Sequence, residues 1–209
     1  DKLFITISSP DEKGTIKNQR FPFLNHKGWD HHCMSFIFQY MSLFHPSTFF
    51  RKIVTECGDR GARKLLPFLH GESLLVPGIL DYFREARERA SETHINLTTN
   101  GSRLSGELAE SILQEGLIDS LIVSIDGGDK ETFEGIRLGL SYDEVRSNVL
   151  RFLRRRNELG LKKPHVSIAM VTVDENKHTR RKFQEAWQDA DDVRYSVYFN
   201  CCLLYTSDA

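Results

Sequence analysis

The stretch LIVSIDGG at residues 121–128 decides the fold class, because an apolar run there ends in a polar, glycine-rich turn. Residues 94–101, HINLTTNG, repeat this order and turn at Asn100-Gly101. A short apolar run bounded by turn-forming residues is typical of a buried strand in a parallel sheet. We therefore expect both stretches to be strands of one sheet, with their polar residues at its carboxyl edge.

Helical patterns separate these strands and continue on both sides of them. Leu108, Ile112 and Leu113 recur at helical spacing between the two stretches, and a longer helix is expected from Ser141 to Gly160. Glu144 lies three residues after Ser141, which is the spacing of a capping box. Further strands are predicted at residues 64–69, 165–171 and 193–199, and further helices near residues 49–57, 79–90 and 183–187.

With residues 3–7 as a first strand, the chain contains about six β/α repeats. This order predicts an α/β fold with a parallel sheet and helical cover, either an open doubly wound sheet or a barrel. In both architectures ligands bind where the carboxyl ends of the strands meet. That rule selects residues 71–73, 99–101 and 124–126 as the candidate site.

Composition excludes two classes of partner. The chain has 209 residues and a formal net charge of −1, so no global field favours nucleic acid or an anionic membrane. No apolar stretch approaches the ~20 residues that a membrane span requires. The arginines at 151 and 154–156 lie on a predicted helix, where we expect a solvated face rather than a phosphate-binding patch. The scattered cysteines, at 33, 57, 201 and 202, indicate no disulfide framework, so we expect a cytoplasmic protein.

Three consecutive strand ends carry motifs of one known family. Residues 70–75, HGESLL, resemble the Gly-Glu-Pro motif of radical S-adenosylmethionine (radical SAM) enzymes, with Ser73 in place of the proline. Residues 97–101, LTTNG, resemble the end of that family's third strand, and residues 123–127, VSIDG, resemble the end of its fourth. Residues 130–137, KETFEGIR, resemble the segment that follows in members with a SPASM extension. The resemblance covers residues 41–200 and depends on three motifs in order at fitting spacing.

The resemblance implies a partial (β/α)6 TIM-like barrel with parallel strands, incomplete or degraded at the N-terminus of this chain. It implies S-adenosylmethionine and a [4Fe-4S] cluster as the cofactors of the parent family. The parent reaction is reductive cleavage of S-adenosylmethionine, followed by hydrogen-atom abstraction from a substrate. In the SPASM-type subgroup the implied substrate is a peptide or a protein.

The resemblance also assigns roles to residues at the strand ends. The backbone around Gly71 and Glu72 would meet the methionine amino group, and Arg137 could pair with the methionine carboxylate. A guanidinium fork suits a carboxylate, and short polar side chains suit ribose hydroxyls. Each residue alone also fits a plain role as a turn former, a cap or a surface charge. The full expected cofactor-binding set adds Asn100 on the rim and Ser124 and Asp126 near the ribose.

The expected cluster loop departs from the family pattern. The family binds its cluster through a C-x-x-x-C-x-x-C loop, in which three thiolates bind three irons. Here the corresponding positions are Leu24, Gly28 and His31, and the nearby thiol is Cys33. A register that ends at Cys33 gives His26 and Asp30 at the other two positions, which also leaves two irons without a thiolate. We therefore expect no cluster in this chain.

A zinc site is an alternative use of the same segment. Imidazole and thiolate are zinc ligands, and His26, His31 or His32, and Cys33 could supply three of them. The spacing is poor and a fourth ligand is missing.

Three segments are expected along the chain. Residues 1–40 are expected to be a degenerate or mistranslated stretch with the would-be first strand and cluster loop, and residues 41–200 the radical SAM-like core. Residues 201–209, CCLLYTSDA, resemble a translated sequencing adapter and are expected to be an artefactual tail, with a frayed natural end as the alternative.

Three functional hypotheses follow. The first is a radical SAM enzyme that is inactive with this sequence, and the second is a cluster-free module that binds a nucleoside or S-adenosylmethionine. The third is an unrelated β/α-barrel enzyme that uses Glu72, Asp126 and His70 or His94 for acid–base chemistry.

Overall fold

The N-terminal unit of the fold is a β-hairpin. The computed structural model describes residues 4–10, 16–22, 32–33, 46–67 and 71–197, and the chain divides into units 1–32 and 33–209. In the first unit β1 (Phe4–Pro10) pairs antiparallel with β2 (Ile16–Pro22). The prediction that residues 3–7 begin the parallel sheet is therefore wrong. Antiparallel partners need only a short connection, and β2 follows β1 too closely for a helical crossover.

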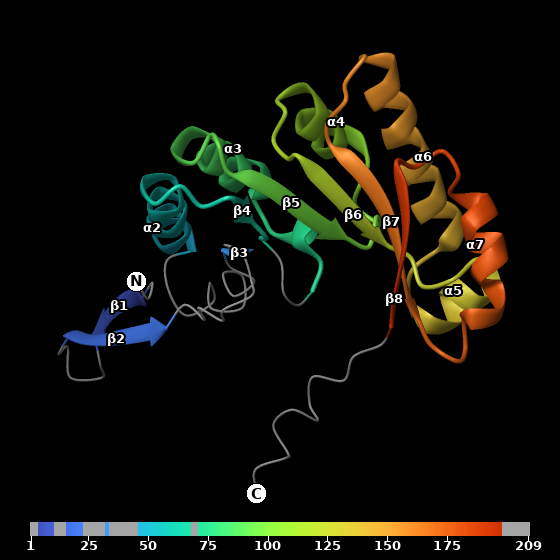
Figure 1. Ribbon diagram of the computed structural model, residues 1–209, viewed down its shortest axis with the longest axis horizontal. Helices are drawn as coiled ribbons and strands as arrows, with labels where there is room; N and C mark the ends of the chain where they lie inside the picture. Colours follow the sequence, from blue (N-terminus) through green and yellow to red (C-terminus); the bar gives the residue numbers. More distant parts are fainter. Residues whose placement is uncertain (1–3, 11–15, 23–31, 34–45, 68–70, 198–209) are drawn as a thin grey trace, which may run out of the picture. The chain divides into compact units, whose positions relative to one another are not determined.

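A parallel sheet organises the second unit. Its strands follow chain order, and in the registered pairs Leu97 lies opposite Leu121 and Val123 opposite Ile168 (Figure 1). The predicted α/β class is confirmed. The barrel is not closed, because in the described residues β8 pairs with β7 alone. The strands are β4 (Lys64–Leu65), β5 (His94–Thr99), β6 (Ser120–Ser124), β7 (His165–Thr172) and β8 (Asp192–Val197), and β3 (His32–Cys33) lies at the unit boundary.

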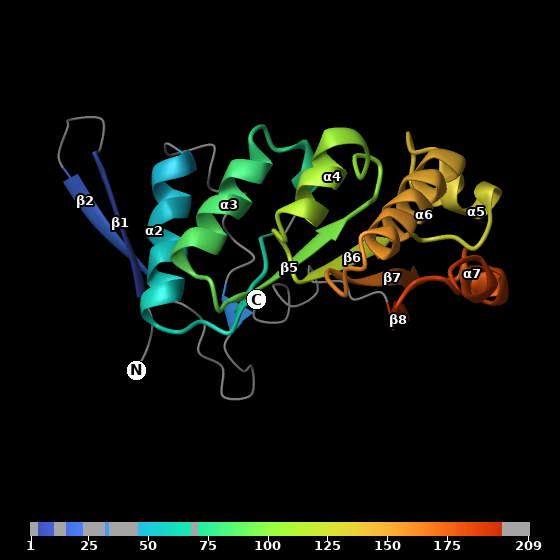
Figure 2. The same ribbon diagram turned by 90° about the horizontal axis from the view of Figure 1, so that it is seen from above.

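Helices pack on one face of the sheet, where α3, α4 and α6 lie side by side (Figure 2). The strand residues that point to them are apolar and fully buried, as Leu97, Leu121 and Ile168 show. The helices are α2 (Pro46–Asp59), α3 (Ile79–Arg89), α4 (Gly106–Gln114), α5 (Lys130–Ile136), α6 (Tyr142–Glu158) and α7 (Arg180–Ala186), with the short 3-10 turns η1 (Ser73–Leu75) and η2 (Lys177–Thr179). None of these is long and apolar enough to cross a membrane.

The opposite face of the sheet carries mainly small and polar side chains, with Ile122 and Val171 as apolar exceptions. We call it the helix-free face, since no helix of the described residues packs on it (Figure 2). Side chains alternate between the two faces along a strand, so the neighbours of the buried apolar residues point to this side. Its members on β5 to β7 are His94, Asn96, Thr98, Ser120, Ile122, Ser124, His165, Ser167, Ala169 and Val171.

The long helix α6 confirms one prediction and corrects another. Ser141 caps it, since its Oγ accepts a hydrogen bond from the Glu144 N–H at 3.5 Å. The arginine run was expected to be solvated, which is wrong for Arg156, because that side chain is buried and pairs with Asp191. Arg156 lies one helical turn after the inward-facing Phe152, so it lies on the buried stripe of the helix.

Two predicted strands differ in length from the observed ones. The strand expected at 64–69 is limited to β4, which ends before Pro67, a residue that cannot donate to a ladder. The last strand was expected to reach residue 199, but the part after Val197 lies outside the described residues.

Candidate functional site

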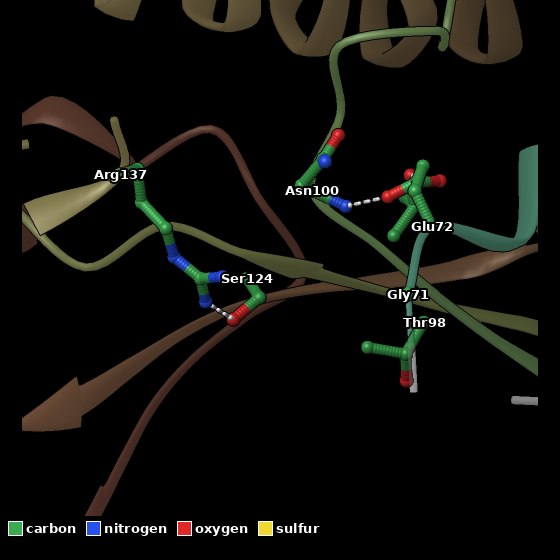
Figure 3. Close-up of a pocket in the computed structure, with 7 residues that line it drawn as sticks. Gly71, Glu72, Thr98, Asn100, Ser124 and Arg137 are labelled. Atoms are coloured by element: carbon green, nitrogen blue, oxygen red, sulfur yellow. Dashed lines mark hydrogen bonds between the residues drawn. The ribbon is translucent and has the colours of Figure 1, made fainter. Parts of the chain in front are cut away.

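A pocket of about 370 Å³ lies at the carboxyl ends of β4, β5 and β6 (Figure 3). Five of the six predicted cofactor-binding residues line it, although they come from separate motifs of the sequence. Asp126 is not among the lining residues. Thr99 belongs to the strand ends that the sequence selected, although it was not assigned to the cofactor, and Thr98 is an addition. The lining residues are Gly71, Glu72, Thr98, Thr99, Asn100, Ser124 and Arg137.

Glu72 joins the loop after β4 to the end of β5. Its Oε1 accepts hydrogen bonds from the Leu74 N–H at 3.1 Å and the Thr99 Oγ1 at 2.6 Å. Its Oε2 accepts one from the Asn100 N–H at 2.6 Å (Figure 3). The carboxylate therefore links the loop after β4 to the end of β5 through hydrogen bonds. A ligand ammonium at this point would have to rely on backbone carbonyls, and Gly71 turns the backbone there with a φ of +81°.

The turn at Asn100-Gly101 is fixed by local bonds. The Asn100 Oδ1 accepts a hydrogen bond from the Ser102 N–H at 2.9 Å, which is an Asx turn. Gly101 has a φ of +79°, and an added Cβ would lie 3.1 Å from the Cγ1 atoms of Val123 and Val145. The buried Asn148 of α6 donates to the Gly101 carbonyl at 3.2 Å. Asn148 was not among the predicted site residues, although an asparagine on the inner stripe of an amphipathic helix is a usable signal.

Arg137 lies between the pocket and Asp126. Its Nε donates to the Asp126 Oδ2 at 2.8 Å, and its Nη2 forms an ion pair with the same oxygen at 2.6 Å. Its Nη2 also donates to the Ser124 Oγ at 3.0 Å (Figure 3). The Asp126 side chain is 8% exposed and that of Arg137 is 35% exposed. Asp126 therefore orients Arg137 from behind, and Arg137 and Ser124 present the polar atoms at the pocket wall.

Asp126 is itself held by β7 and by the loop after it. Its Oδ1 accepts a hydrogen bond from the Val171 N–H at 2.9 Å. Asn176, which is fully buried, donates from Nδ2 to the carbonyls of Asp126 and Val171 at 3.2 and 2.8 Å. Close packing continues at Gly127, where an added Cβ would lie 2.4 Å from the Phe133 nitrogen. Asn176 was not indicated by the sequence, because its partner Asp126 lies 50 residues away and no local pattern marks it.

His94 does not belong to the candidate site, which removes one residue from the hypothesis of an acid–base enzyme. His94 begins β5, so it lies about 16 Å along the strand from the pocket residue Thr99. Burial lowers the pKa of His94, and its Nε2 lies 2.9 Å from the Ser120 Oγ. The prediction that His94 joins Glu72 and Asp126 is therefore wrong. His70 lies outside the described residues.

The expected cluster positions Leu24, Gly28 and His31 also lie outside the described residues, as do His26 and Asp30 of the other registers. Cys33 ends β3, and its side chain is not described. Elsewhere in the described chain Cys57 is buried in α2, and no group of three metal-ligating side chains comes together. The donor atoms required by an iron–sulfur cluster are thus not supplied by the part of the chain that the structure describes.

Comparison with known proteins identifies the domain. The family model described as the Radical SAM superfamily matches residues 48–186. The solved structure of anSMEcpe with bound AdoMet superposes with a TM-score of 0.56 at 16% identity, over 72% of this chain and 42% of that one. Archaeal TYW1 gives a TM-score of 0.45 at 18% identity, over 69% of this chain and 50% of that one.

One curated protein is also similar in sequence. Small ribosomal subunit protein uS8 of Protochlamydia amoebophila (strain UWE25) is 29% identical over 85 residues, which are 41% of this chain and 62% of that protein. The chain therefore spans less than two thirds of this relative and half or less of the two solved structures. The likeness to anSMEcpe supports the fold alone.

Proposed function

This chain belongs to the radical SAM superfamily, and from that premise we propose that it binds S-adenosylmethionine in the pocket at the carboxyl ends of β4, β5 and β6. One observation carries the proposal. Five residues that the family motifs assign to the cofactor lie around one pocket of about 370 Å³. That volume falls within the range of about 300–1,000 Å³ that is usual for small-molecule sites.

The pocket's donors and acceptors suit the parts of S-adenosylmethionine. Arg137 uses its Nε and Nη2 on Asp126 and Ser124, whereas its Nη1 has no hydrogen-bond partner within the described residues. This Nη1 would bind the methionine carboxylate. The hydroxyls of Thr98 and Ser124 and the amide of Asn100 would bind the ribose hydroxyls. Backbone carbonyls beside Gly71 would accept hydrogen bonds from the ammonium group.

We do not propose reductive cleavage of S-adenosylmethionine by this chain. The sequence gives one thiol, Cys33, where the family's cluster needs three, and Leu24 and Gly28 offer no ligand atom. We therefore propose that a chain with this sequence binds S-adenosylmethionine without cleaving it. Within this proposal the core spans residues 41–200, while residues 1–40 and 201–209 contribute nothing to binding.

We further propose that the chain belongs to the SPASM-type subgroup. The support is the resemblance of residues 130–137, whose last residue, Arg137, lines the pocket. Under this assignment the ancestral activity is the parent reaction of that subgroup, hydrogen-atom abstraction from a peptide. It predicts a peptide as the second ligand.

Isothermal titration of S-adenosylmethionine into the 209-residue chain tests the binding proposal. Arg137→Lys keeps the charge but loses the planar fork, so we expect the affinity to fall about tenfold, and Arg137→Leu should lower it about 100-fold. Arg181→Leu is the matched control, because the Arg181 side chain is 91% exposed and, within the described residues, pairs with Glu185 on its own helix. Absence of binding heat at millimolar S-adenosylmethionine would refute the proposal, as would equal effects of Arg137→Leu and Arg181→Leu.

A further inference from the structure

Asn176 connects the ends of two neighbouring strands from the loop that follows β7. It is fully buried, and its Nδ2 donates to the carbonyl of Asp126, after β6, at 3.2 Å and to that of Val171, in β7, at 2.8 Å. Its Oδ1 accepts a hydrogen bond from the Val173 N–H at 2.9 Å. The carboxamide thus uses its donors and its acceptor on backbone groups, which fixes its orientation. Asn176 therefore sets the spacing between the chain after β6 and the end of β7.

Thr179 extends this contact to the glycine turn after Asp126. It is fully buried, and its Oγ1 donates to the Asn176 carbonyl at 2.8 Å and accepts a hydrogen bond from the Gly128 N–H at 3.0 Å. The packing is close, since a Cβ added at Gly128 would lie 2.2 Å from the Thr179 carbonyl oxygen. A buried network in which these groups are satisfied is rigid. We call Asn176 and Thr179 the loop clamp, because they hold both sides of the turn that begins at Asp126.

The loop clamp determines where the Asp126 carboxylate lies. Its Oδ1 accepts a hydrogen bond from the Val171 N–H at 2.9 Å, and this bond depends on the spacing that Asn176 sets. Its Oδ2 contacts Arg137 through Nε at 2.8 Å and Nη2 at 2.6 Å. Such charged hydrogen bonds depend on direction as well as distance. A displaced Asp126 would therefore turn the guanidinium and redirect its Nη1, which has no partner within the described residues, away from the pocket.

We propose that Asn176 is a positioning residue for the S-adenosylmethionine pocket, which keeps Arg137 directed at the methionine carboxylate by holding Asp126 in place. Asn176 is not among the pocket-lining residues, so it acts through these two side chains. Supporting residues of this kind hold a binding group in its productive geometry. Loss of Asn176 weakens the part of binding that depends on the carboxylate and spares the part that depends on the nucleoside. This role rests on the proposed function and adds a determinant of ligand choice outside the three strand-end motifs.

Two ligands separate the carboxylate from the rest of the cofactor. Decarboxylated S-adenosylmethionine keeps the sulfonium, the amine and the nucleoside of S-adenosylmethionine but lacks the carboxylate. In titration calorimetry Asn176→Ala should lower the affinity for S-adenosylmethionine about fivefold and that for the decarboxylated compound less than about twofold. In the Arg137→Leu background Asn176→Ala should cause no further loss, because Asn176 acts on the ligand through Arg137.

Thr179→Val is a milder second variant that keeps the side-chain volume, in case Asn176→Ala does not fold. It removes the hydroxyl that donates to the Asn176 carbonyl, so the affinity for S-adenosylmethionine should fall about threefold, with little change for the decarboxylated compound. Thr93→Val is the matched control. Thr93 is also buried, and its hydroxyl donates to the Ala62 carbonyl at the same 2.8 Å, but it lies before β5 at the amino end of the sheet. It should leave both affinities within about twofold of the parent chain.

The Arg137 Nε–H signal of the 15N-labelled chain gives a readout that needs no ligand. The signal is assigned from its loss in Arg137→Lys. In the parent chain the hydrogen bond to Asp126 should shift it away from the position of solvent-exposed arginines. Asn176→Ala should return it toward that position, whereas Thr93→Val should leave it where it is.

Equal losses of both ligands in Asn176→Ala would overturn the positioning role, because a general loosening of the fold does not select for the carboxylate. An unchanged affinity for S-adenosylmethionine or an unchanged Arg137 signal in this variant would do the same, as would equal effects of Thr179→Val and Thr93→Val. Each of these results leaves the proposed function intact, provided that the parent chain binds S-adenosylmethionine. A parent chain that binds neither ligand contradicts the proposed function, and the Arg137 signal then still shows whether Asn176 positions the guanidinium.

Discussion

Each end of the parallel sheet contains a buried aspartate that pairs with an arginine and accepts a hydrogen bond from a backbone N–H. The two ends differ in whether the arginine keeps a nitrogen without a protein partner. At the amino end Asp119 pairs with Arg87 at 2.5 Å and accepts a hydrogen bond from the Ile95 N–H at 2.8 Å. At the carboxyl end Asp126 pairs with Arg137 at 2.6 Å and accepts one from the Val171 N–H at 2.9 Å. The two carboxylates are equally buried, with 9% and 8% of their side chains exposed.

The two arginines differ in what remains for a ligand. Arg87 directs its other donors to protein carbonyls, with Nε near those of Gly116 and Leu117 and Nη1 on that of Thr93. Arg137 keeps Nη1 without a partner in the described part of the chain and faces the pocket. We therefore expect the ion pair whose arginine nitrogens all have protein partners to serve stability, and the ion pair whose Nη1 has none to serve binding. On this view the amino end of the sheet serves stability and the carboxyl end serves binding, and the variants below test that division.

The largest effect is expected at the amino end. Asp119→Ala leaves Arg87 without its carboxylate and removes the bond to Ile95, so we expect the free energy of unfolding to fall by about 3–5 kcal/mol. Urea unfolding measures it. Asp174→Ala is the matched control, because Lys177 contacts Asp174 at the same 2.8 Å that joins Lys163 to Asp119, yet the Asp174 side chain is 90% exposed. That control should cost less than about 1 kcal/mol, and equal losses would contradict the role of burial.

The pH dependence of stability should come from the same carboxylate. Burial by itself raises the pKa of Asp119, but hydrogen bonds from Lys163, Arg87 and the Ile95 N–H outweigh it and lower the pKa from 3.8 to about 2. Because the folded pKa is below the unfolded one, the carboxylate stabilises the fold above about pH 4 and loses this effect as the pH falls toward 2. The contribution is about 2 kcal/mol, and about half of it should be gone at pH 3.

The comparison of the parent chain with Asp119→Asn between pH 7 and pH 3 isolates this contribution. The difference in their free energies of unfolding should narrow as the pH falls, since the asparagine does not titrate. A difference that stays constant over this range would show that Asp119 is not held by its partners in the way the geometry indicates.

Local sequence patterns predicted most of the second unit. The apolar runs at 94–98 and 121–125 and the stripe of α6 indicated strands and a helix that the structure confirms. The hairpin at the N-terminus was missed, because an isolated apolar run such as residues 3–7 does not reveal whether its partner is parallel or antiparallel. Arg156 was misjudged for a related reason, since its partner Asp191 lies 35 residues away.

The parts of the candidate site that lie at strand ends, or in the turns that follow them, could be predicted from the sequence. Gly71, Asn100 and Ser124 line the pocket because each follows or ends a parallel strand, and sequence order places those ends together. Asp126 was expected in the pocket and lies behind Arg137 instead. Which of two neighbouring polar residues reaches a cavity depends on side-chain packing, which no local pattern records.

At the carboxyl end a smaller effect on binding is expected. Asp126→Asn keeps the shape but removes the charge that orients Arg137, so the affinity for S-adenosylmethionine should fall about tenfold, equivalent to about 1.4 kcal/mol. Titration calorimetry measures this loss. Asp119→Asn is the control, because it removes the corresponding charge at the other end and should leave the affinity of the folded chain unchanged. If Asp119→Asn weakens binding as much as Asp126→Asn, the two ends are not divided between stability and binding.

The smallest effect is expected at the cap of α6. This variant tests whether a loss of helix stability by itself weakens ligand binding in the pocket. Ser141→Ala removes the hydrogen bond to the Glu144 N–H, and a lost N-cap costs about 0.5–2 kcal/mol, with the long 3.5 Å contact favouring the lower end. Urea unfolding should show this loss, and Ser147→Ala on the same helix is the control outside the cap. Asn148 of α6 holds the Gly101 carbonyl from two turns further along, so the pocket should keep its shape and its affinity for S-adenosylmethionine. A tenfold weaker affinity in Ser141→Ala would instead show that the carboxyl end depends on the whole of α6, and the division between the two ends would no longer hold.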